Sequence, residues 1–112
     1  MKSKKVKPDA LDDLYEAILC LETKQECEAF FNDLCTALEL QTMSQRLQVA
    51  RMLTDHHVYT DIVETIGAST ATISRVNRSL GNGYDIVFMR MEQRRKASVT
   101  KDVNSGQEDA ES

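Results

Sequence analysis

Apolar residues recur every three or four positions through most of the chain, which predicts helices rather than strands. The helix predicted at residues 9–22 has five apolar residues at this spacing: Leu11, Leu14, Tyr15, Ile18 and Leu21. Two more helices are predicted at about 24–35 and 37–55, because the T-x-x-E sequences that begin at Thr23 and Thr36 have the form of a capping box. No stretch alternates apolar and polar residues as a strand would. We therefore predict an all-α fold.

The segment from residue 59 to residue 80 has the pattern of two short helices joined by a tight turn. Gly67 lies between their apolar positions, where the end of a helix needs an unhindered backbone. Ser69 precedes the second helix and can cap it. The residues left facing outward are small, polar or basic: Ser69, Thr70, Ala71, Ser74, Arg75 and Arg78. This pattern is typical of a helix-turn-helix that reads the major groove of DNA.

The two ends of the chain differ from its centre. Residues 1–8 are expected to form a flexible basic arm, and residues 9–97 the helical domain. Its last helix is predicted at about 84–96, after the break at Gly81-Asn82-Gly83. Residues 98–112 have no hydrophobic pattern, so we expect a disordered acidic tail.

The net charge of −4 hides an uneven distribution. The regional charges are +4 for residues 1–8, −7 for 9–56, +2 for 57–97 and −3 for 98–112. Two Arg and no acid lie between Thr65 and Tyr84. Because DNA responds to the local field of a protein, this distribution permits DNA binding by the second half of the chain.

Other classes of function have little support in the sequence. The cysteines at positions 20, 27 and 35 form no C-x-x-C pair, and we expect them to be reduced and buried. The adjacent His56 and His57 would diverge on a helix, so no metal site is expected. No catalytic arrangement is recognisable, which argues against an enzyme. No apolar run is as long as a membrane span, and we expect a soluble cytoplasmic protein.

The helices predicted at 24–35 and 37–55 carry more apolar residues than one face can hold, including Leu38, Val49 and Met52. In a chain of 112 residues this indicates surface buried by a second subunit. We expect a homodimer, whose two-fold symmetry suits palindromic DNA. A helical dimeric module that binds a protein partner without DNA is the alternative that these observations leave open.

The sequence TIGASTATISRVNRSL, from Thr65 to Leu80, follows two other recognisable segments, LCTALEL and MSQRLQVARML. With them, roughly residues 11–95 resemble the Trp repressor superfamily, and most closely its YerC/YecD-type group. The resemblance implies a six-helix, intertwined homodimer with a helix-turn-helix. It also implies a bacterial transcription regulator, by analogy a repressor, which inserts the 70–80 helix into the major groove of double-stranded DNA.

The resemblance also suggests roles for individual residues of the recognition helix. Thr70, Ala71 and Thr72 at its start would approach the bases. Ser69 and Ser74 would lie near phosphates, and Arg75 and Arg78 would supply basic groups.

In the Trp repressor, tryptophan lies between the third helix and the recognition helix. The positions of this chain that match its pocket are Thr36, Arg46, Thr72, Arg75 and Ser79. Arg46 stands where the family has the Arg that pairs with the ligand carboxylate. Val76, however, stands where the Trp repressor has a Gly against which the indole lies. The branched side chain occupies that space, so we expect no tryptophan cofactor. The sequence leaves binding of a smaller effector as an alternative.

Overall fold

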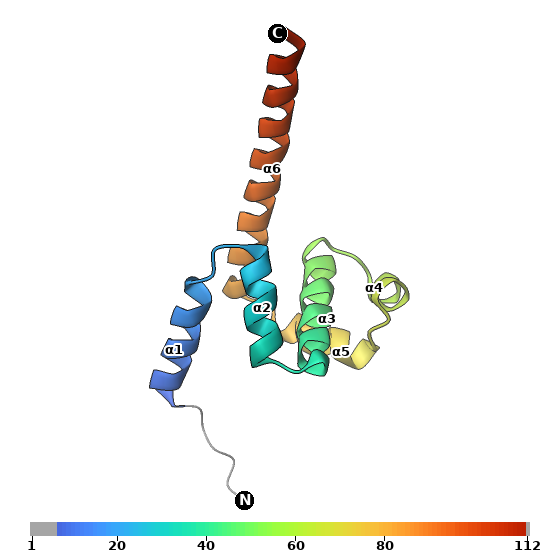
Figure 1. Cartoon of the computed structure of the whole chain (residues 1–112). Helices are drawn as coiled ribbons and strands as arrows, with labels where there is room; N and C mark the ends of the chain where they lie inside the picture. Colours follow the sequence, from blue (N-terminus) through green and yellow to red (C-terminus); the bar gives the residue numbers. More distant parts are fainter. Residues whose placement is uncertain (1–6, 112) are drawn as a thin grey trace, which may run out of the picture. The chain divides into compact units, whose positions relative to one another are not determined.

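The computed structural model describes the backbone of residues 7–111 and the side-chain surroundings of residues 7–99. These residues form helices and no strand (Figure 1), which confirms the all-α fold. The six helices are α1 (Pro8–Leu19), α2 (Lys24–Leu34), α3 (Ala37–Thr54), α4 (Tyr59–Ile66), α5 (Thr70–Ser79) and α6 (Asn82–Glu111). The chain divides after Met43 into an N-terminal and a C-terminal unit, and α3 contributes to both.

Side-chain caps set the starts of α2 and α3. Thr23 Oγ1 accepts a hydrogen bond from the Glu26 N–H at 3.0 Å, and the Glu26 carboxylate accepts one from the Glu22 N–H at 2.8 Å. At α3 the pairing is reciprocal, since the Thr36 N–H donates to Glu39 at 2.8 Å and Thr36 Oγ1 accepts from the Glu39 N–H at 3.1 Å. Both helix starts predicted from the T-x-x-E sequences are confirmed.

The first helix is shorter than the predicted range of 9–22. It begins at Pro8, whose fixed φ suits the first position of a helix, and it ends at Leu19. The N–H groups of Cys20 and Leu21 donate to carbonyls only three residues earlier, at 3.1 Å each. This tighter turn ends the helix, because the α-helical bond reaches back four residues.

The N-terminal unit buries few of its apolar side chains. No residue of α1 or α2 is fully buried, and Leu19 and Leu38 are 78% and 71% exposed. The three cysteines are free, but Cys20 is exposed and the other two are half-buried. Our expectation of buried thiols was therefore wrong for the single chain, because this unit has no core of its own deep enough to enclose them.

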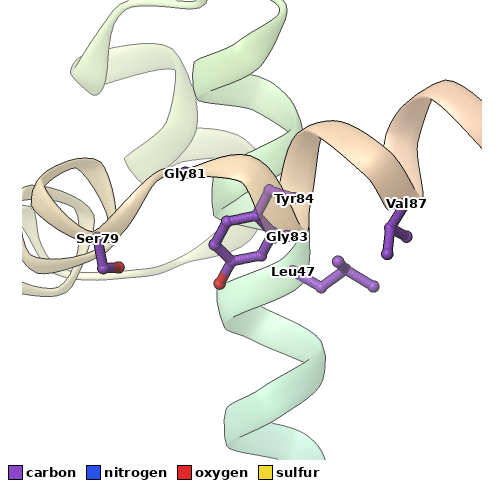
Figure 2. Close-up of a pocket in the computed structure, with 6 residues that line it drawn as sticks. All are labelled: Leu47, Ser79, Gly81, Gly83, Tyr84 and Val87. Carbon is purple, nitrogen blue, oxygen red and sulfur yellow. The ribbon is translucent and has the colours of Figure 1, made fainter.

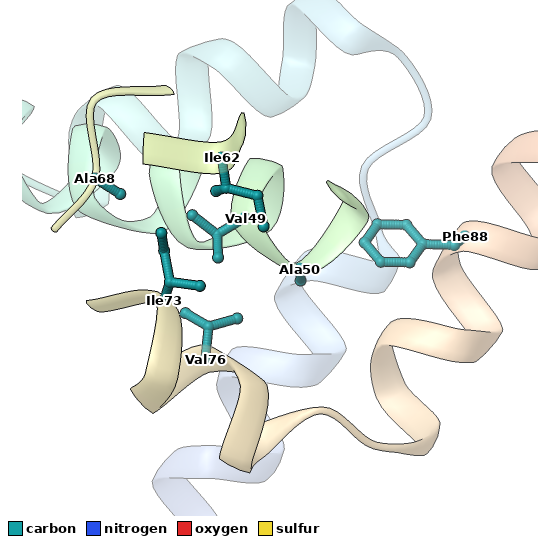
Figure 3. Close-up of a cluster of buried hydrophobic side chains, with 7 residues drawn as sticks. All are labelled: Val49, Ala50, Ile62, Ala68, Ile73, Val76 and Phe88. Carbon is teal, nitrogen blue, oxygen red and sulfur yellow. The ribbon is translucent and has the colours of Figure 1, made fainter. Parts of the chain in front are cut away.

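The C-terminal unit has a core around the helix-turn-helix (Figure 3). Its buried residues come from α3, α4, the turn, α5 and α6: Val49, Ala50, Ile62, Ala68, Ile73, Val76 and Phe88. Val49, Ile62 and Ile73 are fully enclosed. Removing these side chains from water stabilises the unit, by roughly 25 cal/mol for each Å² of apolar surface buried. The same packing fixes α5 against α3.

The last helix is longer than the 84–96 predicted from the sequence. It begins at Asn82 and continues to Glu111, so it includes most of the segment 98–112 for which we expected disorder. The helix can continue through this segment because no Pro follows Pro8 in the sequence. Each residue added to an established helix also gains one backbone hydrogen bond, and this gain does not require an apolar stripe. Of the expected arm at 1–8, residues 1–6 lie outside the described residues, and Pro8 belongs to α1.

No helix in the part of the chain that the structure describes is long and apolar enough to cross a membrane, although α6 has 30 residues.

Candidate nucleic-acid interface

The turn between α4 and α5 depends on Gly67. This residue is in the left-handed region, with φ 82° and ψ 13°, and its N–H donates to the Val63 carbonyl at 2.8 Å. The chain thereby leaves α4 and reaches Ala68, which is buried beneath the turn at 3% exposure. The predicted glycine turn is confirmed, and it sets the direction in which α5 begins.

Ser69 caps the start of α5. Its Oγ accepts a hydrogen bond from the Thr72 N–H at 3.1 Å, and its hydroxyl donates to Thr72 Oγ1 at 3.0 Å. By the geometry of an α-helix, the N–H groups of Thr70 and Ala71 have no carbonyl partner within the helix. The start of α5 therefore presents polar donors to solvent, a property that favours an anionic partner.

The two faces of α5 differ sharply in burial. Ile73 is fully buried and Val76 is 4% exposed, so these residues hold the helix against the core. Ala71, Arg75 and Arg78 project from the opposite face and are exposed.

The structure places all seven predicted DNA-binding residues at the cap or on α5. The exposed ones are Ser69, Thr70, Ala71, Arg75 and Arg78, and the half-buried ones are Thr72 and Ser74. The short side chains gather in the first half of the helix, where the backbone can approach a partner closely.

The exposed face of α5 is basic. Neither Arg75 nor Arg78 forms an ion pair with any side chain of residues 7–99. No acid lies between Thr65 and Tyr84 in the sequence. Both guanidinium groups are therefore available to an anionic partner such as a DNA phosphate.

The residues of the predicted ligand pocket differ in their surroundings. Val76 is packed in the core, Arg46 is exposed, and Thr36 belongs to the cap of α3. The Ser79 hydroxyl donates to the Val76 carbonyl at 3.0 Å. Ser79 also lines a mostly apolar groove of about 380 Å³ (Figure 2). The other residues of this groove are Leu47, Gly81, Gly83, Tyr84 and Val87.

Sequence reasoning missed a charged cluster that joins α3 to α6. The Arg51 guanidinium lies 5.1 Å from the centre of the Phe88 ring, 3.7 Å from Asp55 and 3.8 Å from Glu92. Arg95 binds the same Glu92 carboxylate, and its hydrogen bond is the main reason why the pKa of Glu92 is lowered. This cluster holds Phe88 and Glu92 of α6 against α3. The i,i+3 spacing of Glu92 and Arg95 was visible in the sequence, whereas the contact with Arg51 was not.

Comparison with known proteins places the chain among relatives of the same architecture. The sequence model of the Trp repressor protein family matches residues 9–95. An uncharacterised protein of Bacillus subtilis strain 168, YerC, is 46% identical over 93 residues, which cover 83% of this chain and 89% of YerC. The crystal structure of a TrpR-like protein from Eubacterium eligens ATCC 27750 matches with a TM-score of 0.73 and 54% identity, over 77% of this chain and 92% of that one. A candidate Trp repressor from Staphylococcus aureus matches with a TM-score of 0.73 and 53% identity, over 77% of this chain and 89% of that one.

Proposed function

Because the chain belongs to the Trp repressor family, we propose that it is a transcription regulator that inserts α5 into the major groove of double-stranded DNA. The family inferred from the TIGASTATISRVNRSL motif is confirmed, and so is the helical fold. The observation that carries the proposal is the face of α5 that bears Ala71, Arg75 and Arg78. It is exposed, basic and backed by a packed core.

In this proposal the first turn of α5 reads bases. Thr70, Ala71 and Thr72 face the groove, and Ser69 and Ser74 lie near the backbone phosphates. Short side chains allow the helix to approach closely, and water molecules can complete hydrogen bonds that these side chains do not reach directly.

Arg75 and Arg78 supply the charge that binds phosphates. Each phosphate contact made by a basic side chain releases counterions from DNA, which makes the affinity depend on salt.

We also propose a homodimer. The apolar residues that the single chain leaves exposed, including Leu19 and Leu38, support a second copy that covers them. Two α5 helices related by a two-fold axis would reach half-sites about one helical turn apart, or roughly 34 Å. A dimer on promoter DNA would act as a repressor in the cytoplasm, where the bacterial chromosome lies.

Tryptophan is not part of the proposed mechanism. Val76 is packed among Ala50 and Ile73, and the Ser79 hydroxyl is satisfied by the backbone of its own helix. The recognition helix is thus held by side-chain packing, and we expect DNA binding without a ligand. Titration calorimetry with tryptophan should detect no micromolar binding, and saturable heat at that concentration would contradict this part of the proposal.

The DNA proposal can be tested by fluorescence anisotropy. An operator would first be selected from random duplexes, and binding would then be measured over a range of salt concentrations. Arg75→Ala or Arg78→Ala should each weaken binding and reduce the slope of log affinity against log salt by about 1.8, because each of the two subunits loses one phosphate contact, which contributes about 0.9 to the slope. Lys24→Ala removes an exposed base on α2 and is the matched control.

A wild-type protein without salt-dependent DNA binding would contradict the proposal and favour the alternative of a helical module that binds a protein partner. If both α5 variants bound DNA as tightly as the wild type, the assignment of α5 as the recognition helix would be contradicted.

A further inference from the structure

The exposed side of α4 is acidic, whereas the exposed side of α5 is basic. Ile62 is fully buried and holds α4 on the core, so Asp61 and Glu64 project into solvent. The sequence of α4 contains no Lys or Arg. Neither acid forms an ion pair with a side chain of the described residues 7–99. The first helix of the helix-turn-helix therefore carries two exposed negative charges next to the basic recognition helix.

The helix itself accounts for Asp61 but not for Glu64. Asp61 lies in the first turn of α4, which has no side-chain cap, and the positive end of the helix dipole stabilises a negative charge there. Glu64 lies in the last turn, where the negative end of the dipole makes the same charge unfavourable. Residues that break such a local rule are expected mainly at functional sites. The position of Glu64 therefore indicates a role outside the stability of α4.

The helix-turn-helix carries α4 to DNA together with α5. Ile62 of α4 and Ile73 of α5 lie in one buried core (Figure 3), and the turn at Gly67 joins the two helices directly. When the second helix of this motif lies in the major groove, the first helix crosses the phosphate backbone. The exposed carboxylate of Glu64 would then be close to phosphates of the same charge.

We propose that Glu64 is a repulsive element at the DNA interface, which limits the affinity of the regulator for DNA of any sequence. Its carboxylate repels phosphates without regard to the bases beside them, because every duplex presents the same backbone charge. Non-specific binding depends almost entirely on charge, whereas an operator also offers base contacts to the first turn of α5. The inference rests on the DNA binding proposed for α5, and it adds a residue that opposes that binding.

Two substitutions at this position provide the test, measured on the full chain by fluorescence anisotropy with a selected operator and an unrelated duplex of the same length. Glu64→Gln removes the charge with little change in shape. It should tighten binding to both duplexes by about threefold at low salt, because each of two subunits loses one repulsion between unit charges roughly 10 Å apart in water. Glu64→Lys replaces repulsion by attraction and should tighten binding by about tenfold. Both gains should shrink as added salt screens the charges.

The same substitutions at Glu28, an exposed Glu on α2, are the matched controls and should bind both duplexes like the wild type. Urea unfolding shows whether each variant is folded, and a purely structural role of Glu64 would change this stability without a gain in affinity that depends on salt.

Variants at position 64 that bind like the α2 controls would overturn the proposal, and so would a gain confined to the operator. A wild type that binds neither duplex at low salt would instead refute the proposed function itself.

Discussion

Replacing Gly67 with Ala should destabilise the protein by about 1 kcal/mol, although the added methyl group would touch nothing. The residue has a φ of +82°, and no atom lies within 4 Å of a Cβ built on it. The cost is therefore conformational, since an L-residue in the left-handed region costs about 1–2 kcal/mol. Ala also restricts the unfolded chain more than Gly, which offsets roughly 0.4–1 kcal/mol of that cost.

Gly83→Ala is the matched control, because it makes the same chemical change inside α6. No atom lies within 4 Å of a Cβ at this position either. Here the backbone is helical, so Ala should stabilise the protein by about 0.5–1 kcal/mol. Gly67→Asn should cost less than Gly67→Ala, since Asn adopts the left-handed region more readily than other residues.

Urea unfolding followed by far-UV circular dichroism gives the free energy of unfolding for each variant. All samples need the same protein concentration, because the stability of a dimer depends on it. A decrease of about 1 kcal/mol in the free energy of unfolding corresponds to a decrease in Tm of roughly 4–8 °C for a domain of this size. If Gly67→Ala and Gly83→Ala shifted stability in the same direction, the reasoning from backbone conformation would be refuted.

Three further predictions concern the core and two carboxylates. Ile73→Ala removes a fully buried side chain and should destabilise the protein by about 2–5 kcal/mol in the same urea assay. The pKa of Glu39 is lowered by hydrogen bonds from the backbone and hydroxyl of Thr36. This cap therefore stabilises the folded protein at a pH above the ordinary pKa of a Glu carboxyl, and the stabilisation is lost as the pH falls through the lowered pKa. Thr36→Ala keeps the backbone N–H but removes the hydroxyl, so an NMR titration should show a partial rise in the pKa of Glu39, and an unchanged pKa would refute the contribution of the hydroxyl. Arg95→Ala should likewise raise the pKa of Glu92 toward its ordinary value, because the hydrogen bond from Arg95 is the main cause of its lowering.

Local features determined most helix boundaries and the turn. Thr23, Thr36 and Ser69 cap helices through hydrogen bonds to residues three or four positions away, so the sequence alone identified them. Gly67 ends α4 through its own backbone conformation, which is equally local. The candidate DNA-binding residues follow from the same features, because the cap and the two apolar positions of α5 fix which of its faces is exposed.

Only the tertiary structure decided which apolar residues form the core. Along α3 the sequence places Leu40, Met43, Leu47, Ala50 and Leu53 at helical spacing, with Val49 outside this stripe. Val49 is nevertheless fully buried, whereas Leu47 is 41% exposed. The approach of Arg51 to Phe88 and Glu92 likewise joins residues about 40 positions apart. Burial and such contacts depend on which surfaces distant helices turn toward each other, and the periodicity of a single helix does not contain that information.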